Sequence, residues 1–192
     1  MSDAVGGNDL TEAAFFYLRH GETDWNRDDL IQGVTDVPLN DTGRAQAAEA
    51  AERFRGVEVS TLCVSPLSRA RETADIVNRV LRRPVDVIDE LAEVGFGVKE
   101  GVPRGDLFRE WEQGRTPEGA EPYDAFMARA LAAVNQALAR PGPVLIVAHG
   151  GVYRAVRERV GLGDTLRLAN ALALHHQPPG PEAGGWRVAP LP

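Results

Sequence analysis

The stretch AFFYLRHG, residues 14–21, runs from five apolar residues into two basic side chains and a glycine. A continuous apolar run of this length predicts a buried β-strand. We therefore expect the strand to end at Leu18 and to carry Arg19 and His20 into a loop. In α/β proteins, the carboxyl ends of strands are where active sites lie.

Two further apolar runs, at 62–64 and 144–147, end in the same way. The first leads through Ser65 toward Arg69, and the second leads to His149, which two glycines follow. Glycine at that position lets the backbone approach a ligand closely. Because the carboxyl ends of parallel strands meet at one edge of a sheet, we expect these side chains to converge.

Helical patterns separate the strands. An alanine-rich stretch predicts a helix that ends at Phe54, with Asp41 or Thr42 as its N-cap, and Pro66 suits the first turn of the next helix. The alternation of strands and helices predicts an α/β layered domain with a mostly parallel sheet. The other expected elements are helices at 66–81, 106–113, 123–138 and 152–160 and strands at 85–88, 171–176 and 186–188.

No repeat or long linker divides the chain, so we expect one domain over residues 14–192. Residues 1–13 are polar and glycine-containing, which predicts a flexible tail. Residues 94–122 are rich in glycine and proline and show little periodicity, so they are expected to cap the site and to determine its specificity.

The composition excludes several classes of function. With 192 residues, a net charge of −7 and a pI of about 5.1, the chain has an acidic surface that disfavours nucleic acid and anionic membranes as partners. Cys63 is the one cysteine, so no internal disulfide can form, and its apolar neighbours predict a buried position. No signal peptide or membrane-spanning run is visible, which predicts a cytoplasmic protein.

The histidines do not predict a metal site. Zinc sites need three or four ligands, and neither HExxH nor CxxC occurs. His175 and His176 are adjacent, so on a strand they would face opposite sides. Nothing matches a P-loop either. We therefore expect neither a metal nor another cofactor.

Nucleophilic chemistry fits these residues better. A neutral imidazole can attack a phosphoryl group if one ring nitrogen is free and the other is bound to an acceptor, for which the backbone near Gly21 is a candidate. The guanidinium groups of Arg19 and Arg69 could hold the phosphoryl oxygens, and a protonated His149 could be a third donor. A carboxyl group should protonate the leaving alcohol.

With these residues in place, the sequence resembles the histidine phosphatase superfamily, also called the phosphoglycerate mutase-like family. Five blocks match in order over most of the chain. They are LRHGET at 18–23 with WN at 25–26; QG, PL and TG at 32–33, 38–39 and 42–43; SPLSRA at 65–70 with TA at 73–74; LAE at 91–93 with FG at 96–97 and EG at 100–101; and AHGG at 148–151. Glu121, Phe126 and Arg129 are similar to the helix that follows the fourth block.

The resemblance implies a three-layer α/β/α sandwich and a role for each matched residue. His20 would be the phosphorylated nucleophile, in a phosphate pocket made by Arg19, Arg69 and His149. Glu93, which the resemblance selects over the nearby Glu90 and Glu100, would be the proton donor and later the base. Further substrate contacts would come from Thr23, Asn26, Gln32, Gly33 and Gly150.

Three functions remain open. The first is a metal-independent phosphomonoesterase that acts on a small phosphorylated metabolite through a phosphohistidine. The second is a phosphoglycerate-type mutase; family mutases carry a longer basic insertion after the acid block and resemble His-Gly-Asn where this chain has His149-Gly150-Gly151, which favours the phosphatase. The third is a non-catalytic module that binds a phospho-ligand. Two departures from the family pattern, Lys99 and Gly119-Ala120-Glu121-Pro122, lie in the expected cap.

Overall fold

The computed structural model describes residues 9–162, 168–180 and 184–192. Its strands form one six-stranded sheet in the order β3-β2-β4-β1-β5-β6. The strands are β1 (Phe15–Arg19), β2 (Thr61–Val64), β3 (Val85–Val87), β4 (Val144–Ala148), β5 (Ala173–Gln177) and β6 (Arg187–Pro190). The helices are α1 (Asp24–Arg27), α2 (Asp41–Arg53), α3 (Ser68–Leu81), α4 (Leu107–Glu112), α5 (Tyr123–Leu138) and α6 (Gly150–Arg159), with short 3₁₀ turns η1 (Asp89–Leu91) and η2 (Gly97–Lys99).

The four strands β1 to β4 pair in parallel, whereas β5 runs antiparallel to β1 and β6 antiparallel to β5. In the register of the sheet, Arg19 at the end of β1 lies opposite Ala148, and Val64 at the end of β2 lies opposite Val147. The three polar strand ends identified in the sequence therefore reach the same edge of the sheet.

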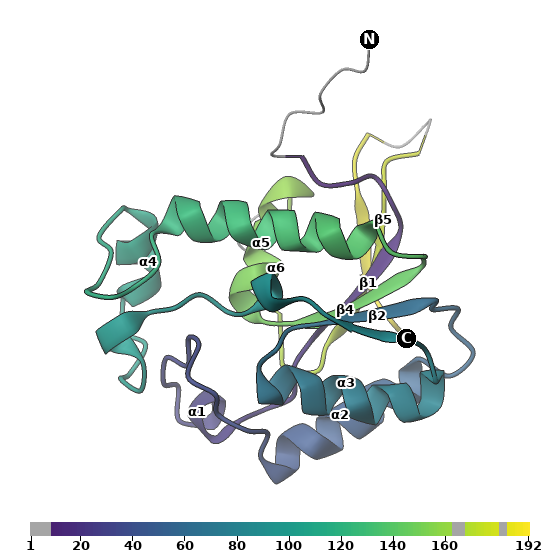
Figure 1. The fold of residues 1–192 in the computed structure, drawn as a ribbon, viewed down its shortest axis with the longest axis horizontal. Helices are drawn as coiled ribbons and strands as arrows, with labels where there is room; N and C mark the ends of the chain where they lie inside the picture. The colour runs from purple at the N-terminus through teal and green to yellow at the C-terminus, as the bar shows by residue number, and fades with distance from the viewer. Residues whose placement is uncertain (1–8, 163–167, 181–183) are drawn as a thin grey trace.

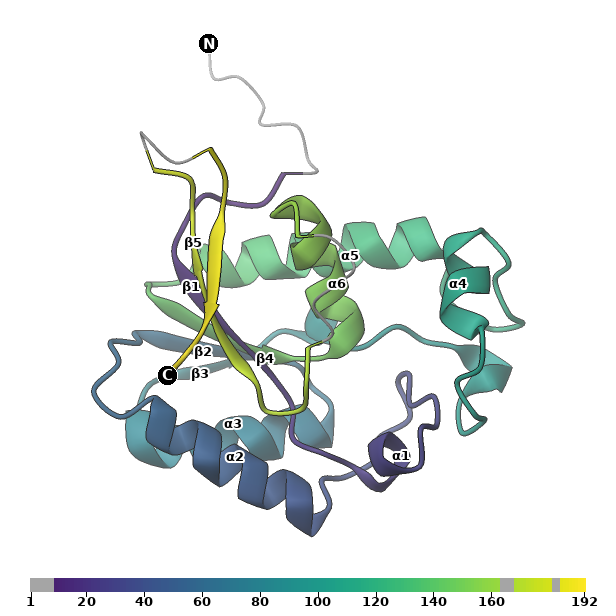
Figure 2. The ribbon, with the colours of Figure 1, turned by 180° about the vertical axis from the view of Figure 1, so that it is seen from behind.

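Helices cover both faces of this sheet, as Figure 1 shows: α5 and α6 lie on one side, and α2 and α3 lie on the other. Alternate residues of one strand enter the two cores. Phe15 and Tyr17 pack with α5 and α6, whereas Phe16 and Leu18 pack with α2 and α3. The predicted α/β/α sandwich with a mostly parallel sheet is confirmed. Seen from both sides, α1 and α4 lie at the same end of the sheet (Figures 1 and 2).

Several helix boundaries differ from those predicted. Asn40, not Asp41 or Thr42, is the N-cap of α2, because its side chain accepts a hydrogen bond from the backbone N of Gly43 at 2.8 Å. The helix α6 begins at Gly150, two residues before its predicted start, with His149 in the extended N-cap conformation. This early start brings the amino end of α6 to the edge of the sheet where β4 ends.

The segments at the edges of the fold are also ordered by contacts. Residues 9–13 form no helix or strand, but Leu10 is buried and Asn135 of α5 hydrogen-bonds to Asp9 and Thr11. This places part of the predicted tail on the surface of the domain. Within 94–122, Trp111 of α4 is fully buried and donates to the carbonyl of Glu121 at 2.8 Å. No helix in the described ranges is long and apolar enough to cross a membrane.

Candidate functional site

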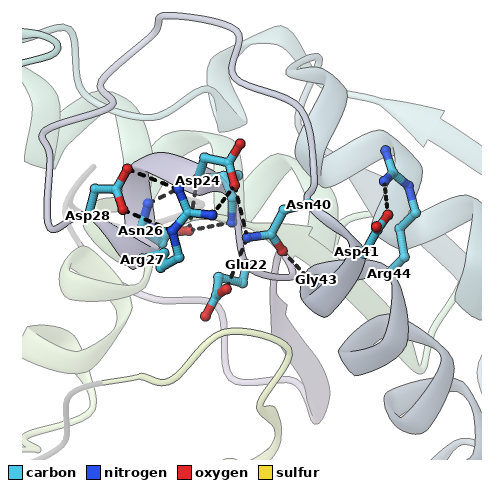
Figure 3. A network of polar contacts seen from close by, with 10 residues as sticks. Glu22, Asp24, Asn26, Arg27, Asp28, Asn40, Asp41, Gly43 and Arg44 are labelled. Atoms are coloured by element: carbon cyan, nitrogen blue, oxygen red, sulfur yellow. Dashed lines mark hydrogen bonds and ion pairs between the residues drawn. The ribbon is translucent and has the colours of Figure 1, made fainter.

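The loop that follows β1 packs directly against the amino end of α2. A Cβ added at Gly21 would lie 2.3 Å from the carbonyl oxygen of Gly43, and one added at Gly43 would lie 2.1 Å from that of Glu22. Asn40 fixes this approach, since its backbone N donates to the Glu22 carbonyl at 3.0 Å and its amide donates to the Glu22 carboxylate at 3.0 Å (Figure 3). The residue just before Gly21, His20, therefore lies in a loop that packs closely against α2.

His20 is 2% exposed, and its Nδ1 lies 2.7 Å from the carbonyl oxygen of Gly21. A carbonyl can only accept, so Nδ1 carries the proton of the neutral ring and Nε2 holds a lone pair. Burial, followed by the charges of Arg19 and Arg69, holds the pKa of His20 well below its usual value. His20 is therefore a neutral imidazole with Nε2 available, and the predicted acceptor near Gly21 is confirmed.

His149 faces His20 with its ring centroid 5.2 Å away. The ring is fully buried, and its Nε2 lies 2.7 Å from the hydroxyl of Ser65 at the end of β2. Tyr17 holds the backbone, because its hydroxyl donates to the His149 carbonyl at 2.8 Å. Burial, then Arg69 and His20, lowers the pKa of His149. Nδ1 has no hydrogen-bond partner in the part of the chain that is described.

Two guanidinium groups flank the imidazoles. Arg69, at the first turn of α3, is fully buried, and it donates through Nη1 to the carbonyl of Thr35 at 2.9 Å and through Nη2 to that of Gly33 at 2.8 Å. Burial lowers the pKa of Arg69, and nearby carboxylates oppose this effect. Arg19 donates to the carbonyl of Leu168 at 2.7 Å. Both side chains line the same cavity as His20.

The candidate acid, Glu93, reaches the cavity from the loop after η1. Its carboxylate accepts hydrogen bonds from the backbone N of Val94 at 3.0 Å and of Gly151 at 2.9 Å. Arg129 of α5 holds this loop by donating to carbonyl oxygens at 90, 92 and 93, while its guanidinium pairs with Glu121 at 2.7 Å. Glu90 and Glu100 do not line the cavity, so Glu93 is the one of the three considered that reaches it.

The cavity has a volume of about 600 Å³. His20, Arg19, Arg69 and Glu93 line it together with Gly150 and Gly151, at the amino end of α6. A helix amino end favours bound anions. Residues of the cap and of α6 also line this cavity, among them Phe96, Arg104, Phe108, Arg109, Trp111, Tyr153, Arg154 and Arg157.

The predicted substrate contacts divide into two groups. Asn26, Gln32 and Gly33 line the cavity, as Gly150 does. Thr23 is fully buried behind its wall, where its hydroxyl donates to the side chain of Gln32 at 3.0 Å. Thr23 also caps α1 in a reciprocal capping box with Asn26. Thr23 therefore positions two lining residues and does not line the cavity itself.

The model of the histidine phosphatase superfamily (branch 1) matches residues 15–177. The chain belongs to this family.

Relatives with related descriptions extend over most of the chain. A Bacillus subtilis (strain 168) protein described as the uncharacterized phosphatase PhoE is 38% identical over 160 residues, which are 80% of this chain and 82% of that protein. A Proteus mirabilis protein described as the probable phosphoglycerate mutase GpmB is 35% identical over 147 residues, 70% of this chain and 68% of that protein.

Solved structures agree with the fold. A mycobacterial glucosyl-3-phosphoglycerate phosphatase in complex with VO3 aligns with a TM-score of 0.77 at 25% identity, over 91% of this chain and 96% of that one. YhfR from Bacillus stearothermophilus aligns with a TM-score of 0.80 at 27% identity, over 92% and 95%.

In this member of the histidine phosphatase superfamily, two residues that the sequence did not single out contact the loop that carries His20. Asn170, just before β5, donates from Nδ2 to the carbonyls of His20 and Gly21 and to the amide oxygen of Asn26, at 3.0 to 3.2 Å. Thr73 of α3 accepts from the backbone N of Gly21 at 3.0 Å. The sequence predicted a strand at 171–176 but not its antiparallel pairing with β1, and this pairing brings Asn170 to the end of β1.

The described residues contain no group of three or more histidine, cysteine or acidic side chains placed to hold a metal ion. His175 and His176 lie on opposite faces of β5, stacked on Phe16 and Phe15 respectively, as the strand alternation predicted. Cys63 is fully buried, also as predicted. The cavity is lined by one neutral imidazole, two guanidiniums and one carboxylate, and the second imidazole, His149, lies behind His20 without lining the cavity itself. This set is suited to phosphoryl transfer.

Proposed function

We propose that this chain is a metal-independent phosphomonoesterase that transfers the phosphoryl group of a small metabolite to His20 and then to water. The observation that carries this proposal is the 2.7 Å contact between Nδ1 of His20 and the carbonyl of Gly21. That contact fixes the tautomer in which Nε2 is the nucleophile. The lowered pKa of His20 keeps the nucleophile unprotonated at neutral pH.

In the first step, Nε2 of His20 attacks phosphorus and the bond to the ester oxygen breaks. Glu93, in its protonated form, donates its proton to the departing oxygen, so the alcohol leaves neutral. Arg19 and Arg69 would hold the equatorial oxygens of the transferring group, where charge accumulates. His149 would add a hydrogen bond from Nδ1, which carries the proton of the neutral ring when the Ser65 hydroxyl donates to Nε2.

In the second step, the Glu93 carboxylate accepts a proton from water as the water oxygen attacks phosphorus. The N–P bond breaks, and its electron pair returns to Nε2 of His20. Inorganic phosphate leaves, and Glu93 is again protonated for the next turnover. One carboxyl group therefore serves as acid and then as base.

The charges of the cap and α6 residues that line the cavity favour hydrolysis over mutase chemistry. A mutase must hold a bisphosphate and exclude water, so it needs cationic groups that are not already neutralised. Here Arg104 pairs with Asp29 at 2.9 Å and Arg109 with Asp106 at 3.1 Å. Arg154 pairs with Glu112. These ion pairs reduce the positive charge that three of the cavity's arginines offer to a second phosphoryl group.

The relative described as a probable phosphoglycerate mutase keeps mutase activity as the second candidate. The two functions differ in product. We would incubate the purified protein with a panel of phosphorylated metabolites, phosphoglycerates included, and follow phosphorus NMR. A phosphatase gives inorganic phosphate, whereas a mutase gives a positional isomer of the phosphoester.

His20→Ala is the control for both functions. We expect it to abolish turnover, and we expect quenching of the unaltered protein in alkaline denaturant to trap an acid-labile, base-stable phosphate on His20. Activity should persist in the presence of a chelator. Full turnover by His20→Ala, or binding of phosphate without any turnover of the panel by the unaltered protein, would rule out the proposed function.

A further inference from the structure

Glu100 is a half-buried carboxylate outside the cavity, and both of its oxygens are saturated with donors. One oxygen accepts from the backbone N of Val34 at 3.1 Å and of Phe96 at 2.9 Å. The other accepts from the backbone N of Thr35 at 2.9 Å and from the Thr35 hydroxyl. Hydrogen bonds to an ionised acceptor are about twice as strong as neutral ones. Glu100 therefore holds the loop that contains Val34 and Thr35 in one conformation.

The same loop supplies the acceptors that orient Arg69. The carbonyl of Thr35 accepts from Nη1 of Arg69 at 2.9 Å, and that of Gly33 accepts from Nη2 at 2.8 Å. Thr35 thus donates hydrogen bonds to Glu100 from its N–H and its hydroxyl, and its carbonyl accepts a hydrogen bond from Arg69. Glu100 and Arg69 are connected through a single residue.

Gly33 shows how closely this connection is fitted. Its φ is +56°, a backbone conformation that favours glycine, and a Cβ there would lie 2.1 Å from a carboxylate oxygen of Glu100. The carboxylate occupies the space that a side chain would fill. Backbone pairing supports the contact, since Gly101 donates to the carbonyl of Ile31 at 2.8 Å.

Glu100 also contributes negative charge near the buried guanidinium of Arg69. Arg69 is fully buried, and a buried cation needs nearby negative charge. The carboxylates whose charges favour the cationic form of Arg69 are those of Glu93, Asp36 and Glu100. Glu93 must change protonation during the proposed reaction. Glu100 takes no part in that proton transfer, and its four hydrogen-bond donors keep its carboxylate in place near Arg69 throughout the cycle.

We propose that Glu100 is a positioning residue for the phosphoryl-binding Arg69: it fixes the loop at 33–35, and the loop fixes the guanidinium. This inference rests on the proposed function for its catalytic consequence. In the sequence, Glu100 is one of the carboxylates near the acid Glu93. The inference gives Glu100 the role of orienting Arg69 and not that of a proton donor.

The test is Glu100→Gln. Its amide oxygen can replace the oxygen that faces Val34 and Phe96, where both partners are donors, so the amide NH2 would face Thr35. The Thr35 hydroxyl can accept from that NH2, but the Thr35 N–H loses its acceptor. We expect kcat/KM for an aryl phosphate to fall ~10- to 100-fold and inhibition by inorganic phosphate to weaken ~10-fold, less than the ~10³-fold expected for removing Arg69 itself.

A double-mutant cycle separates this role from a general structural one. If Glu100 acts through Arg69, then Glu100→Gln in an Arg69→Ala background should change kcat/KM less than ~2-fold. An equal loss in both backgrounds would show that Glu100 acts independently of Arg69 and would overturn the inference. Glu118→Gln, an exposed glutamate of the same segment, is the charge-matched control and should leave kcat/KM unchanged.

Thr35→Val is the second variant, should Glu100→Gln fold poorly. It removes the hydroxyl contact to Glu100 and keeps the carbonyl that Arg69 uses, and it should weaken phosphate inhibition by ~3- to 10-fold. Unchanged phosphate inhibition in a folded Thr35→Val protein would contradict the inference. If the unaltered protein turns over no phosphoester, the proposed function fails, and direct binding of inorganic phosphate to Glu100→Gln and the unaltered protein still tests the positioning role.

Discussion

Gly151→Ala should separate the proposed acid from the rest of the site. A Cβ at Gly151 would lie 2.2 Å from one carboxylate oxygen of Glu93 and 3.1 Å from Cζ of Phe126. Both contacts are with side chains, so the helix α6 can accept alanine while the carboxylate cannot keep its place. The Glu93 oxygen must retreat by about 1 Å, and a misplacement of that size costs up to ~10²-fold in rate.

The loss should depend on the leaving group. An alkyl phosphate needs a proton on its departing oxygen, so its kcat/KM should fall ~100-fold, about 2.7 kcal/mol of transition-state stabilisation. Nitrophenolate leaves without protonation, so nitrophenyl phosphate should lose less than ~5-fold. Steady-state release of phosphate from the two esters by Gly151→Ala and by Glu93→Gln measures this difference directly.

Stability and position provide the controls. Alanine in the first turn of α6 removes backbone freedom from the unfolded chain and adds ~0.5–1 kcal/mol of stability, so the melting temperature should not fall by more than a few degrees. Gly185→Ala, where nothing lies within 4 Å, should leave both rates unchanged. Equal losses for both esters in Gly151→Ala would show that Glu93 does not act on the leaving group.

Two further changes test other parts of the site, and a third tests the buried histidine of β5. Asn170→Ala removes the donor shared by the carbonyls of His20 and Gly21, and we expect ~10-fold lower kcat with folding retained, measured with nitrophenyl phosphate; an unchanged kcat would contradict this role. Ser65→Ala removes the partner of His149 and should lower kcat/KM ~3- to 10-fold, and a loss confined to thermal stability would refute it. Burial lowers the pKa of His176 to about 3 in the folded protein. Below about pH 6.5 His176 is therefore protonated in the unfolded chain but stays neutral in the folded protein, so the free energy of unfolding decreases as pH falls. His176→Phe should reduce the slope of unfolding free energy against pH between about 6 and 4 by ~1.4 kcal/mol per pH unit, and an unchanged slope in chemical denaturation would contradict it.

The sequence predicted a layered α/β domain with a mostly parallel sheet because its strands are short, apolar and regularly separated by helices, and the family resemblance implied the three-layer sandwich. Each predicted strand exists, and α5 has the predicted bounds. The predicted helix boundaries were wrong where several neighbouring residues could each cap the helix. Asn40, Asp41 and Thr42 are all good N-caps, and the choice of Asn40 depends on its tertiary contact with Glu22, which no local pattern contains.

The sequence predicted the residues that line the site, but it did not predict the residues that hold the surrounding loops in place. Arg19, His20 and His149 follow strands that pair in register, so their convergence follows from the parallel sheet alone. Asn170 and Glu100 act through contacts between segments distant in sequence, across 150 residues and 66 residues respectively. Such contacts depend on loop conformations set by the complete fold, and a glycine with positive φ such as Gly33 shows its purpose only when its neighbour is known.

The site's electrostatics give the supporting residues their significance. Arg69 and His149 are fully buried, and within the described ranges neither Nε of Arg69 nor Nδ1 of His149 has a hydrogen-bond partner. A buried polar atom without a partner costs ~1–3 kcal/mol, so folding alone does not favour this arrangement. The chain as a whole carries a charge of −7, which would repel an anionic substrate. A rigid group of donors, held in place by Gly21, Glu100 and Asn170 before any anion arrives, offsets that repulsion locally, and the same rigidity keeps the reorganisation needed in the transition state small.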